Sequence, residues 1–468
     1  MFEIKNSKKD IKNSNCVYFI ETKKDISVLD YLKLDKKIIT KIEEKLKEEK
    51  SEFINFFLWN KDFENIYIFI YNKSDKKSLV DFVSESSRKL PKNFTFFLQN
   101  DKNLSVILKS IFLSNYSFDR YKSEKIEKNY TVVVDKKYNH LIQVELELIN
   151  NICLARDLWE TPSNDLYPES FTKLVKATKF KNTKIKVLSA KQIEKKGLWL
   201  IHAVWKWSVH KPNIVIFERI IDKKLPTVGL VWKWVTFDTG WIQVKPWNSM
   251  HEMKWDMWGA ACVFATMKEL DNKDLNVNIV AAIGLAENHI SGEAYKPSDI
   301  ITAYNKKTVD IIHTDAEWRL VMADVMSYIS DKYKLDNLMT VATLTGACMV
   351  ALGFRYAWVM WNDEKMISKI LKNSEKSEER YNRLPFDDYF VSKTKGNIAD
   401  LENLNTGVYA GSTMWAAFLS NFCDNDEKYT HLDIAGPALN GYEPVWYMNK
   451  WNTGFWVDSL STLFQELK

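Results

Sequence analysis

The first third of the chain alternates short apolar runs with charged stretches of helical periodicity. Four runs have the length and the β-branched or aromatic content of strands, and they cover residues 17–21, 65–71, 94–99 and 130–135. Between them, two stretches have the apolar spacing of amphipathic helices, over residues 35–50 and 77–90. Strands and helices in alternation predict an α/β layer domain over residues 1–140.

A long helical stretch over residues 141–160 follows and runs into the sequence TPSNDLYP. Proline and asparagine at this point predict the end of the helix, so residues 141–164 are expected to form a connecting helix and loop. Beyond residue 165 we expect further strands over residues 184–189, 212–218, 225–232, 277–286 and 337–344. Several of these runs are apolar throughout, which is typical of a central, mostly parallel sheet with helices on both faces. A larger second α/β domain is therefore predicted over residues 165–468.

The composition narrows the class of protein. Hydrophobic residues make up 46% of the 468 residues, which argues against disorder, and no apolar run reaches the ~18 residues of a membrane span. The first ten residues lack the apolar segment of a secretory signal, and the five cysteines have no CxxC spacing, as expected in a reducing cytoplasm. The net charge of +5 comes mainly from lysine, whereas nucleic-acid readers favour arginine, so nucleic-acid binding is not expected to be the main role.

Charged residues gather beside the expected strands of the second domain. Lys233 and Asp238 follow the strand that starts at residue 225, and Asp256 immediately precedes an apolar helix. Asp315 and Glu317 lie between another apolar run and the next helix. Ligands of open α/β sheets bind at the carboxyl ends of strands, so these side chains are expected to converge.

Any one of these charges would more often be a solvated surface group. Four carboxylates that meet in a partly buried site would repel one another unless cations bridge them. Oxygen ligands favour Mg²⁺, Mn²⁺ or Zn²⁺, and a paired site suits hydrolysis. The nearby His289 and His313 are each more often packing or loop histidines than ligands.

The same segments belong to longer motifs that occur in a definite order. They are ARDL..TPSN (155–164), FDTGW (237–241), KPWNSMHEMKWDMWGAA (245–261), ENHISGEAYKPSD (287–299), TDAEWRL (314–320), TVATLTGA (340–347), NIADLENLN (397–405), AGSTM (410–414) and HLDIAGPALN (431–440). Together they resemble the leucyl aminopeptidase family of dinuclear-metal cytosol aminopeptidases, over the whole second domain. The resemblance implies a macro-domain-like domain over residues 1–140 and a catalytic metallo-aminopeptidase domain over residues 165–468. It also implies a cytoplasmic homohexamer that releases amino-terminal residues, Leu-like ones preferred, from peptides with a free amino terminus.

Two adjacent sites for divalent Zn²⁺ or Mn²⁺ are implied by this resemblance. The ligands of the more exchangeable ion would be Asp238, Asp315 and Glu317. The tighter ion would be held by Lys233, Asp238, Asp256 and Glu317, so that Asp238 and Glu317 bridge the two ions. Only a neutral amine has a lone pair for a metal, and two cations nearby would lower the pKa of Lys233 enough to provide it.

The family pattern also places two residues at catalytic positions outside the ligand set. Lys245 would stabilise the developing oxyanion, and Arg319 would hold a bicarbonate that relays a proton. The family has an apolar pocket for the side chain of the substrate's amino-terminal residue. The positions that line it are matched by Met253, Thr343, Leu344 and Gly346. From the residues alone, ordinary core packing at a strand end explains these four about as well. Two other readings stay open, namely a DNA-binding member and a catalytically inactive homologue of the family.

Glycine is scarce in this chain and tryptophan is abundant, with 14 and 18 residues respectively. Glycine is usually ~7% of a protein, and the two counts together give about that share of the 468 residues. Tryptophan stands where the family has glycine at Trp232, Trp234, Trp241, Trp247, Trp258, Trp318, Trp446, Trp451 and Trp456, and Trp199, Trp205 and Trp207 fit the same pattern. Each such tryptophan in a tight turn would cost ~1–3 kcal/mol of backbone strain. Summed over these positions, the strain would exceed the ~5–15 kcal/mol that stabilises a typical folded protein. We hypothesise that most of these positions are glycine in the natural protein, through UGA codons that its source reads as glycine.

Overall fold

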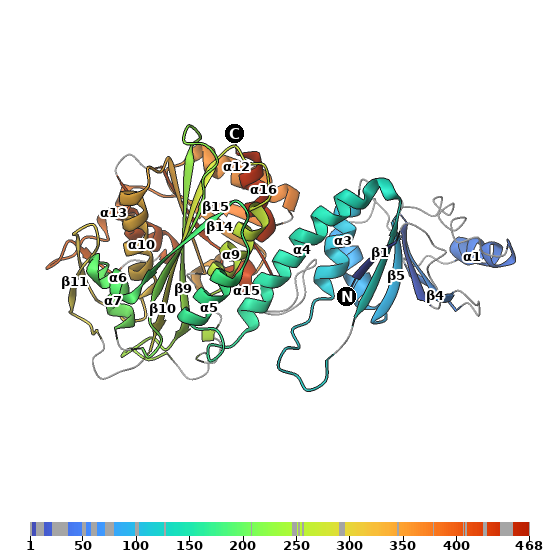
Figure 1. The fold of residues 1–468 in the computed structure, drawn as a ribbon, viewed down its shortest axis with the longest axis horizontal. Helices are drawn as coiled ribbons and strands as arrows, with labels where there is room; N and C mark the ends of the chain where they lie inside the picture. The colour runs from blue at the N-terminus through green and yellow to red at the C-terminus, as the bar shows by residue number, and fades with distance from the viewer. Residues whose placement is uncertain are drawn as a thin grey trace. The chain divides into compact units, whose positions relative to one another are not determined.

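The computed structural model of the chain (Figure 1) contains two compact units, one built from Met1–Asn150 and the other from Asn151–Tyr442 and Lys450–Lys468. Each unit has its own sheet and its own buried core. The structure describes residues 2–5, 14–20, 36–48, 53–57, 63–70, 79–98, 103–125, 128–206, 208–245, 250, 253–254, 257–289, 295–343, 346–377, 379–405, 407, 410–424, 428–439 and 453–467.

The amino-terminal unit is built on a six-stranded sheet in the order β1-β6-β5-β2-β4-β3. All neighbouring strands are parallel except the antiparallel pair β3 and β4. The strands are β1 (Phe2–Lys5), β2 (Ser14–Ile20), β3 (Phe53–Phe57), β4 (Phe63–Ile70), β5 (Asn93–Leu98) and β6 (Asn129–Val134), and the helices are α1 (Lys36–Glu48), α2 (Leu79–Arg88) and α3 (Leu104–Ser114). The four strands and two helices predicted for this region are confirmed. The edge strands β1 and β3 were not predicted, because they are only four and five residues long.

The predicted helix over residues 141–160 is confirmed as α4 (Asn139–Glu160), which follows a short 3-10 turn at Lys136–Tyr138. Its carboxyl-terminal half belongs to the second unit. There the buried Arg156 donates hydrogen bonds to the carbonyl oxygen of Thr453, the shorter being 2.7 Å. This arginine holds the end of the helix against the last part of the second unit.

The second unit contains an eight-stranded sheet in the order β15-β14-β17-β13-β9-β10-β8-β7. Its strands are β7 (Lys184–Ser189), β8 (Asn213–Arg219), β9 (Thr227–Asp238), β10 (Asn278–Asn288), β13 (Asn337–Ala342), β14 (Tyr356–Met360), β15 (Arg380–Arg383) and β17 (Lys428–Asp433). The four central strands β17, β13, β9 and β10 are parallel, and antiparallel pairs occur toward both edges. A small second sheet joins β11 (Ile300–Thr302), β12 (Thr308–Asp310) and β16 (Leu401–Glu402).

Helices cover both faces of the large sheet, so the unit has three layers (Figure 1). One face carries α6 (Ala190–Lys195), α7 (Trp199–Trp205), α10 (Trp318–Lys332), α13 (Asp388–Ser392) and α14 (Gly411–Ser420). The other carries α5 (Pro168–Ala177), α9 (Trp258–Leu270), α12 (Glu364–Ser377) and α16 (Val457–Glu466), and α11 (Gly346–Leu352) packs with α15 (Ala435–Leu439). Every residue of β10 is buried, as expected for an apolar strand between two helical layers.

The predicted fold class, an α/β protein with a mostly parallel central catalytic sheet, agrees with this architecture. One local prediction was wrong. Lys233 and Asp238 were expected to follow a strand that ends near residue 232, but β9 continues to Asp238 and contains both residues. The extension is stable because β9 is central, and its backbone pairs with β10 beyond Lys233. Among the described residues, no helix is both long and apolar enough to cross a membrane.

Candidate metal centre

Asp238 is the last residue of β9, and its carboxylate is fully buried. Its Oδ1 accepts hydrogen bonds from the backbone N–H of Gly240, at 2.9 Å, and from the side-chain amide of Asn288, at 2.6 Å. Asn288 is the last residue of the neighbouring strand β10 and pairs with Asp238 in the ladder. These two donors hold one oxygen, so the direction of Oδ2 is fixed as well.

Asp315 and Glu317 lie in the turn that leads from β12 into α10. Asn403 holds this turn: its Oδ1 accepts from the N–H groups of Ile312 and His313, at 2.7 and 3.1 Å, and its amide donates to the carbonyl of His313 at 2.7 Å. The Thr314 hydroxyl then donates to the Gly240 carbonyl at 2.8 Å. The turn is therefore tied to the loop that follows Asp238.

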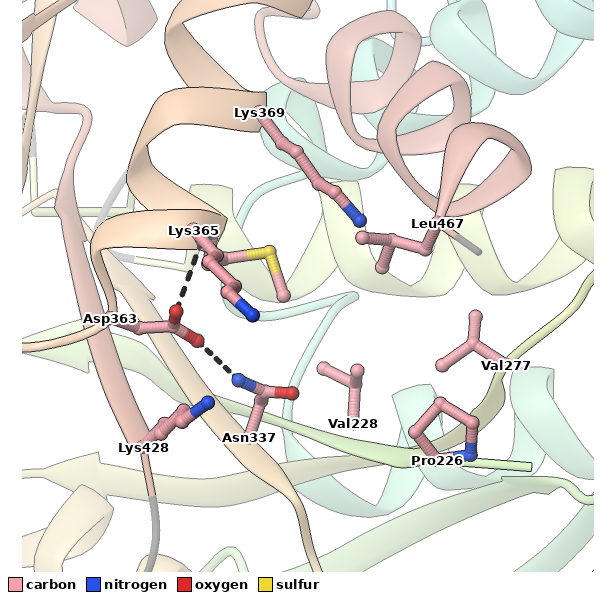
Figure 2. A pocket seen from close by; sticks show the side chains of 10 residues that line it. Pro226, Val228, Val277, Asn337, Asp363, Lys365, Lys369, Lys428 and Leu467 are labelled. Atoms are coloured by element: carbon pink, nitrogen blue, oxygen red, sulfur yellow. Dashed lines mark hydrogen bonds between the residues drawn. The ribbon is translucent and has the colours of Figure 1, made fainter. Parts of the chain in front are cut away.

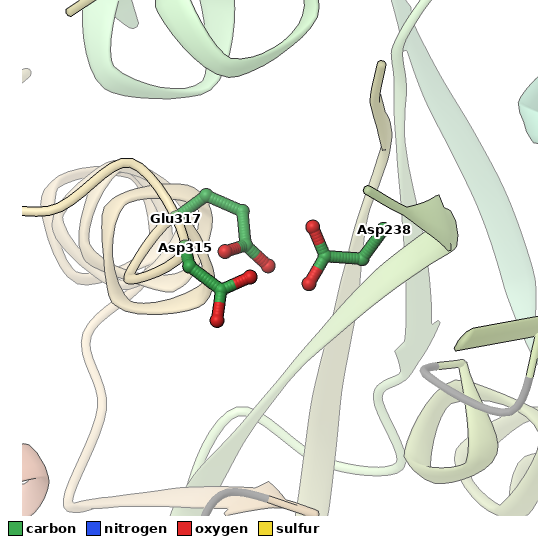
Figure 3. Close-up of side chains that lie close together, drawn as sticks. All are labelled: Asp238, Asp315 and Glu317. Carbon is green, nitrogen blue, oxygen red and sulfur yellow. The ribbon is translucent and has the colours of Figure 1, made fainter. Parts of the chain in front are cut away.

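Three carboxylates converge as a result (Figure 3). One oxygen each of Asp238, Asp315 and Glu317 can be chosen so that all three lie within 4.8 Å of one another. Glu317 is fully buried like Asp238, and Asp315 is partly buried. Burial and the neighbouring charge of Asp238 raise the pKa of Asp315, against a smaller opposing effect of Lys245. Buried oxygen ligands that repel one another fit a divalent cation.

Two lysines face this carboxylate cluster. The Nζ atom of Lys245 lies 2.8 Å from Oδ2 of Asp238 and also forms an ion pair with Asp315. The Nζ atom of Lys233 lies 3.6 Å from Oε1 of Glu317, and the Lys233 side chain is buried. It also lies only 2.6 Å from the centre of the Trp318 ring. The cluster thus contains more carboxyl groups than lysine side chains, which suits a bound cation.

Arg319 is the second residue of α10 and is 3% exposed. Burial lowers the pKa of its guanidinium to about 9. The guanidinium carbon lies 3.5 Å from the centre of the Trp415 ring, and Nε and Nη2 have no hydrogen-bond partner among the described residues. A buried cation with two unused donors is suited to a small anion.

The structure thus brings together Lys233, Lys245, Asp238, Asp315 and Glu317, with Arg319 close enough for its pKa to respond to the charge of Glu317. The predicted ligand Asp256 and the predicted pocket residue Leu344 lie outside the described residues. Met253 is half-buried, Thr343 is half-buried directly after β13, and Gly346 begins α11. His313 accepts a hydrogen bond from the backbone N–H of Asp315 at 3.2 Å, which is the role of a loop histidine.

Sequence reasoning missed Asn288 and Asn403. Both belong to motifs that carried the family resemblance, and Asn288 ends an apolar strand, where a buried amide needs a partner. A polar residue at the carboxyl end of a buried strand was the signal that could have identified Asn288. Asn403 gave no such signal, because its partners lie some 90 residues earlier in the chain.

A pocket of about 130 Å³ lies at the opposite ends of the strands (Figure 2). Its lining includes Val228 near the start of β9, Asn337 at the start of β13 and Lys428 at the start of β17. The Asp363 carboxylate in its wall is already bound to the side chain of Asn337 and the N–H of Met366. The pocket is therefore separate from the carboxylate cluster, and its carboxylate is engaged in holding α12.

A buried carboxylate cluster with two lysines, at the carboxyl edge of a three-layer α/β sheet, is a site of the kind that metal-dependent hydrolases use. Residues 153–461 match the model of the cytosol aminopeptidase family, catalytic domain. Most of these residues belong to the second unit, which is therefore the catalytic unit. The chain belongs to the cytosol aminopeptidase family and is a leucyl aminopeptidase-type hydrolase.

One curated relative is similar to this chain in sequence, and two solved structures are similar to it in fold. The probable cytosol aminopeptidase of Fusobacterium nucleatum is 35% identical over 451 residues, covering 92% of this chain and 93% of that protein. The crystal structure of cytosol aminopeptidase from Coxiella burnetii has the same fold, with a TM-score of 0.84 at 23% identity over 99% of both chains. The bottromycin maturation enzyme BotP in complex with Mn has a TM-score of 0.81 at 24% identity, over 97% of this chain and 99% of that one.

Proposed function

We propose that this protein is a two-metal aminopeptidase that releases amino-terminal residues, Leu-like ones preferred, from peptides. The observation that carries the proposal is the convergence of Asp238, Asp315 and Glu317 beside two lysines. These three carboxylates would hold one Zn²⁺ or Mn²⁺ ion. A second ion would be held by Asp238 and Glu317 together with Lys233 and Asp256. Bound ions of this kind acidify a water molecule and polarise the scissile carbonyl.

Lys245 is the group that faces the reacting carbonyl in this proposal. Its Nζ atom contacts both Asp238 and Asp315, so the side chain is held against the carboxylate cluster. A fixed cation at this point stabilises the negative charge that develops on the substrate oxygen. The opposing charges of the two carboxylates also position the Lys245 side chain before substrate arrives.

Arg319 is proposed to hold a bicarbonate that relays a proton during water attack. Its support is the buried guanidinium, whose Nε and Nη2 bind no described residue. A carbonate oxygen pair would satisfy both donors in the bidentate geometry that arginine favours. Replacing Arg319 with alanine is expected to abolish any stimulation of hydrolysis by added bicarbonate.

The remaining parts of the proposal rest on the family. Met253, Thr343, Leu344 and Gly346 would line an apolar pocket for the first side chain, which would explain a preference for leucine. The active form would be a cytoplasmic homohexamer. Size measurement by sedimentation tests the assembly, and relative hydrolysis of leucyl, lysyl and glutamyl amides tests the pocket.

Hydrolysis of a leucyl amide with added Mn²⁺ or Zn²⁺ tests the central proposal. Lys245→Ala is expected to lower kcat by about 10²–10³-fold with metal binding retained, and Glu317→Ala to lose metal binding and activity together. Lys369→Ala, which changes a lysine of the pocket at the other end of the sheet, is the matched control and should stay active. A Lys245→Ala protein with full activity would contradict the proposal.

The inactive-homologue alternative has one specific observation in its favour. Trp318 covers the Nζ of Lys233, which would keep that amine from a metal. A well-folded protein that binds neither Mn²⁺ nor Zn²⁺ and leaves leucyl amides intact would support this alternative. The DNA-binding alternative predicts retention on DNA that weakens steeply with salt, independently of the metal-site variants.

A further inference from the structure

Three tryptophans have a backbone conformation that suits glycine. Trp241, Trp361 and Trp456 have φ angles of 61°, 109° and 94°, in the left-handed region that large side chains rarely adopt. Trp241 directly follows Gly240, which has a φ of 79°, so the turn after Asp238 contains two successive left-handed residues. Two such residues in a row are the conformation for which a glycine pair is best suited.

Other indole rings lie closer to neighbouring residues than is normal in packed proteins. The ring of Trp234 lies 3.8 Å from that of Phe171, centre to centre, and the ring of Trp361 lies 3.5 Å from that of Phe386, both pairs being tilted by 40°. Tilted aromatic pairs normally keep ~4.5–7 Å between centres. The indole of Trp232 fills the position where a side chain on Gly259 of α9 would begin. The strand β9 and helix α9 are therefore spaced for small residues.

Several of these tryptophans also bury the indole N–H group, a hydrogen-bond donor, away from any acceptor among the described residues. The indole N–H groups of Trp205, Trp234, Trp241 and Trp258 are buried and have no hydrogen-bond partner among the described residues. Buried tryptophan normally has a partner for this group. The metal centre shows the same conflict, because the Trp318 ring lies 2.6 Å from the Nζ of Lys233. Glycine at position 318 would remove the ring that crowds this amine.

We propose that the protein made in its own source carries glycine at the tryptophan positions of the catalytic unit with these conflicts, encoded by UGA codons read as glycine. The positions are Trp205, Trp232, Trp234, Trp241, Trp258, Trp318, Trp361 and Trp456. Left-handed backbone identifies Trp241, Trp361 and Trp456, and short distances between ring centres identify Trp234 and Trp361. Buried indole N–H groups without a partner among the described residues add Trp205 and Trp258. The contact with Gly259 adds Trp232, and the contact with Lys233 adds Trp318. The proposal adds Trp361 to the positions where the family motifs alone indicate glycine.

Peptide masses of the protein purified from its source decide the question directly. The tryptic peptides that end at Lys233 and at Arg319 contain positions 232 and 318, and the peptide that starts at residue 234 contains positions 234 and 241. Each position is expected to show the mass of glycine in place of tryptophan. Peptides that contain tryptophan at these positions would overturn the proposal. This result does not depend on activity or on bound metal.

A pair of synthetic genes tests the physical argument in a host that reads UGG as tryptophan. One gene encodes the chain with tryptophan at the eight positions and the other encodes glycine there. The glycine protein is expected to have the higher unfolding temperature and to bind Mn²⁺, as measured by calorimetry. The tryptophan protein should have a lower unfolding temperature or fail to fold. Trp199→Gly is the control, because Trp199 is 40% exposed and its ring makes an edge contact of normal distance, 5.4 Å between centres, with His202. This substitution should not raise the unfolding temperature.

The two proposals fail in different ways. The Mn²⁺ measurement rests on the proposed function, whereas the peptide masses and the unfolding temperature do not. A glycine protein that folds well but neither binds Mn²⁺ nor cleaves leucyl amides would contradict the aminopeptidase function alone. A tryptophan protein as stable as the glycine protein would contradict the structural argument made here for glycine.

Discussion

Asn288 determines how Asp238 faces the carboxylate cluster. Its side-chain amide donates to Oδ1 of Asp238, and its backbone carbonyl accepts from the N–H and the hydroxyl of Thr239, each at 3.0 Å. One residue therefore fixes both the carboxylate and the start of the loop that carries Lys245. Partners of this kind that orient a metal ligand commonly change metal affinity by ~10–100-fold when removed.

Asn288→Ala is expected to weaken Mn²⁺ binding by about 10–100-fold, because Asp238 loses the donor that orients it. Titration calorimetry measures the affinity, and kcat at saturating Mn²⁺ should recover most of its value. Asn278→Ala is the matched control: Asn278 is a buried asparagine at the other end of the same strand, and its amide bonds to carbonyls of residues 222 and 225. This control should lose stability and keep its Mn²⁺ affinity. Equal losses of affinity in both variants would contradict a positioning role for Asn288.

The sequence predicted the convergence of Asp238, Asp315 and Glu317 correctly, because the rule that strand ends converge needs only the order of the elements. It could not predict the amides that orient them. The hydrogen bonds of Asn403 reach back to residues 312 and 313, and such distant pairings depend on the register of the small sheet. Lys233 was predicted as a ligand but not as a strand residue. The predicted strand ended where the apolar run meets a charged residue, whereas β9 continues through Lys233 to Asp238.

Among the helices, α10 connects the carboxylate cluster to the rest of its layer through Asp324. This carboxylate is fully buried and accepts hydrogen bonds from the backbone N–H groups of Leu200, Ile201 and Tyr304, at 2.8 to 3.1 Å. It therefore joins α10 to the first turn of α7 and to the loop between β11 and β12. Burial outweighs these hydrogen bonds and raises the pKa of Asp324 to about 7.

The raised pKa predicts a pH-dependent stability. Between about pH 4 and pH 7 the folded chain keeps Asp324 protonated while the unfolded chain ionises it, so the contribution of this group to the free energy of unfolding falls as the pH rises. The loss is complete above pH 7 and amounts to about 4 kcal/mol at most. Asp324→Asn, which cannot ionise, should flatten the decline in a series of urea unfolding curves from pH 4 to pH 8.

Asp331 is the matched control for this experiment. It lies at the exposed end of the same helix, where hydrogen bonds from Lys332 and Tyr304 lower its pKa. A lowered pKa contributes stability that is lost only at acid pH, so Asp331→Asn should leave the decline between pH 4 and pH 7 unchanged. An Asp324→Asn protein with the wild-type decline would show that another group causes it.

The elements that the sequence predicted share a simple property, which is a long apolar run or a clear helical period. Strand β10 and helix α4 are examples, with 11 and 22 residues. Strands β14, β15 and β17 were not predicted. β14 is only five residues long, β15 is a polar edge strand with the sequence RYNR, and β17 mixes charged and apolar residues. Their structure comes from pairing with neighbours that are distant in sequence, which a local pattern does not reveal.

Metal binding is expected to stabilise one of the two units and not the other. All five proposed metal ligands lie between residues 233 and 317, within the catalytic unit, and the described part of the amino-terminal unit contains no comparable carboxylate cluster. A ligand that binds only folded protein stabilises it by about 2.7 kcal/mol at 100 times its Kd. Because the amino-terminal sheet has its own core, that gain should not reach it.

Hydrogen exchange with and without Mn²⁺ measures this difference peptide by peptide. Adding Mn²⁺ should slow exchange in peptides from β9 and α10, and leave peptides from β5 and β6 unchanged. Asp238→Asn provides the control: it removes a proposed ligand, so the response to Mn²⁺ should disappear. Equal slowing in both units would mean that they unfold together, and a response to Mn²⁺ that persists in Asp238→Asn would place the metal elsewhere in the chain.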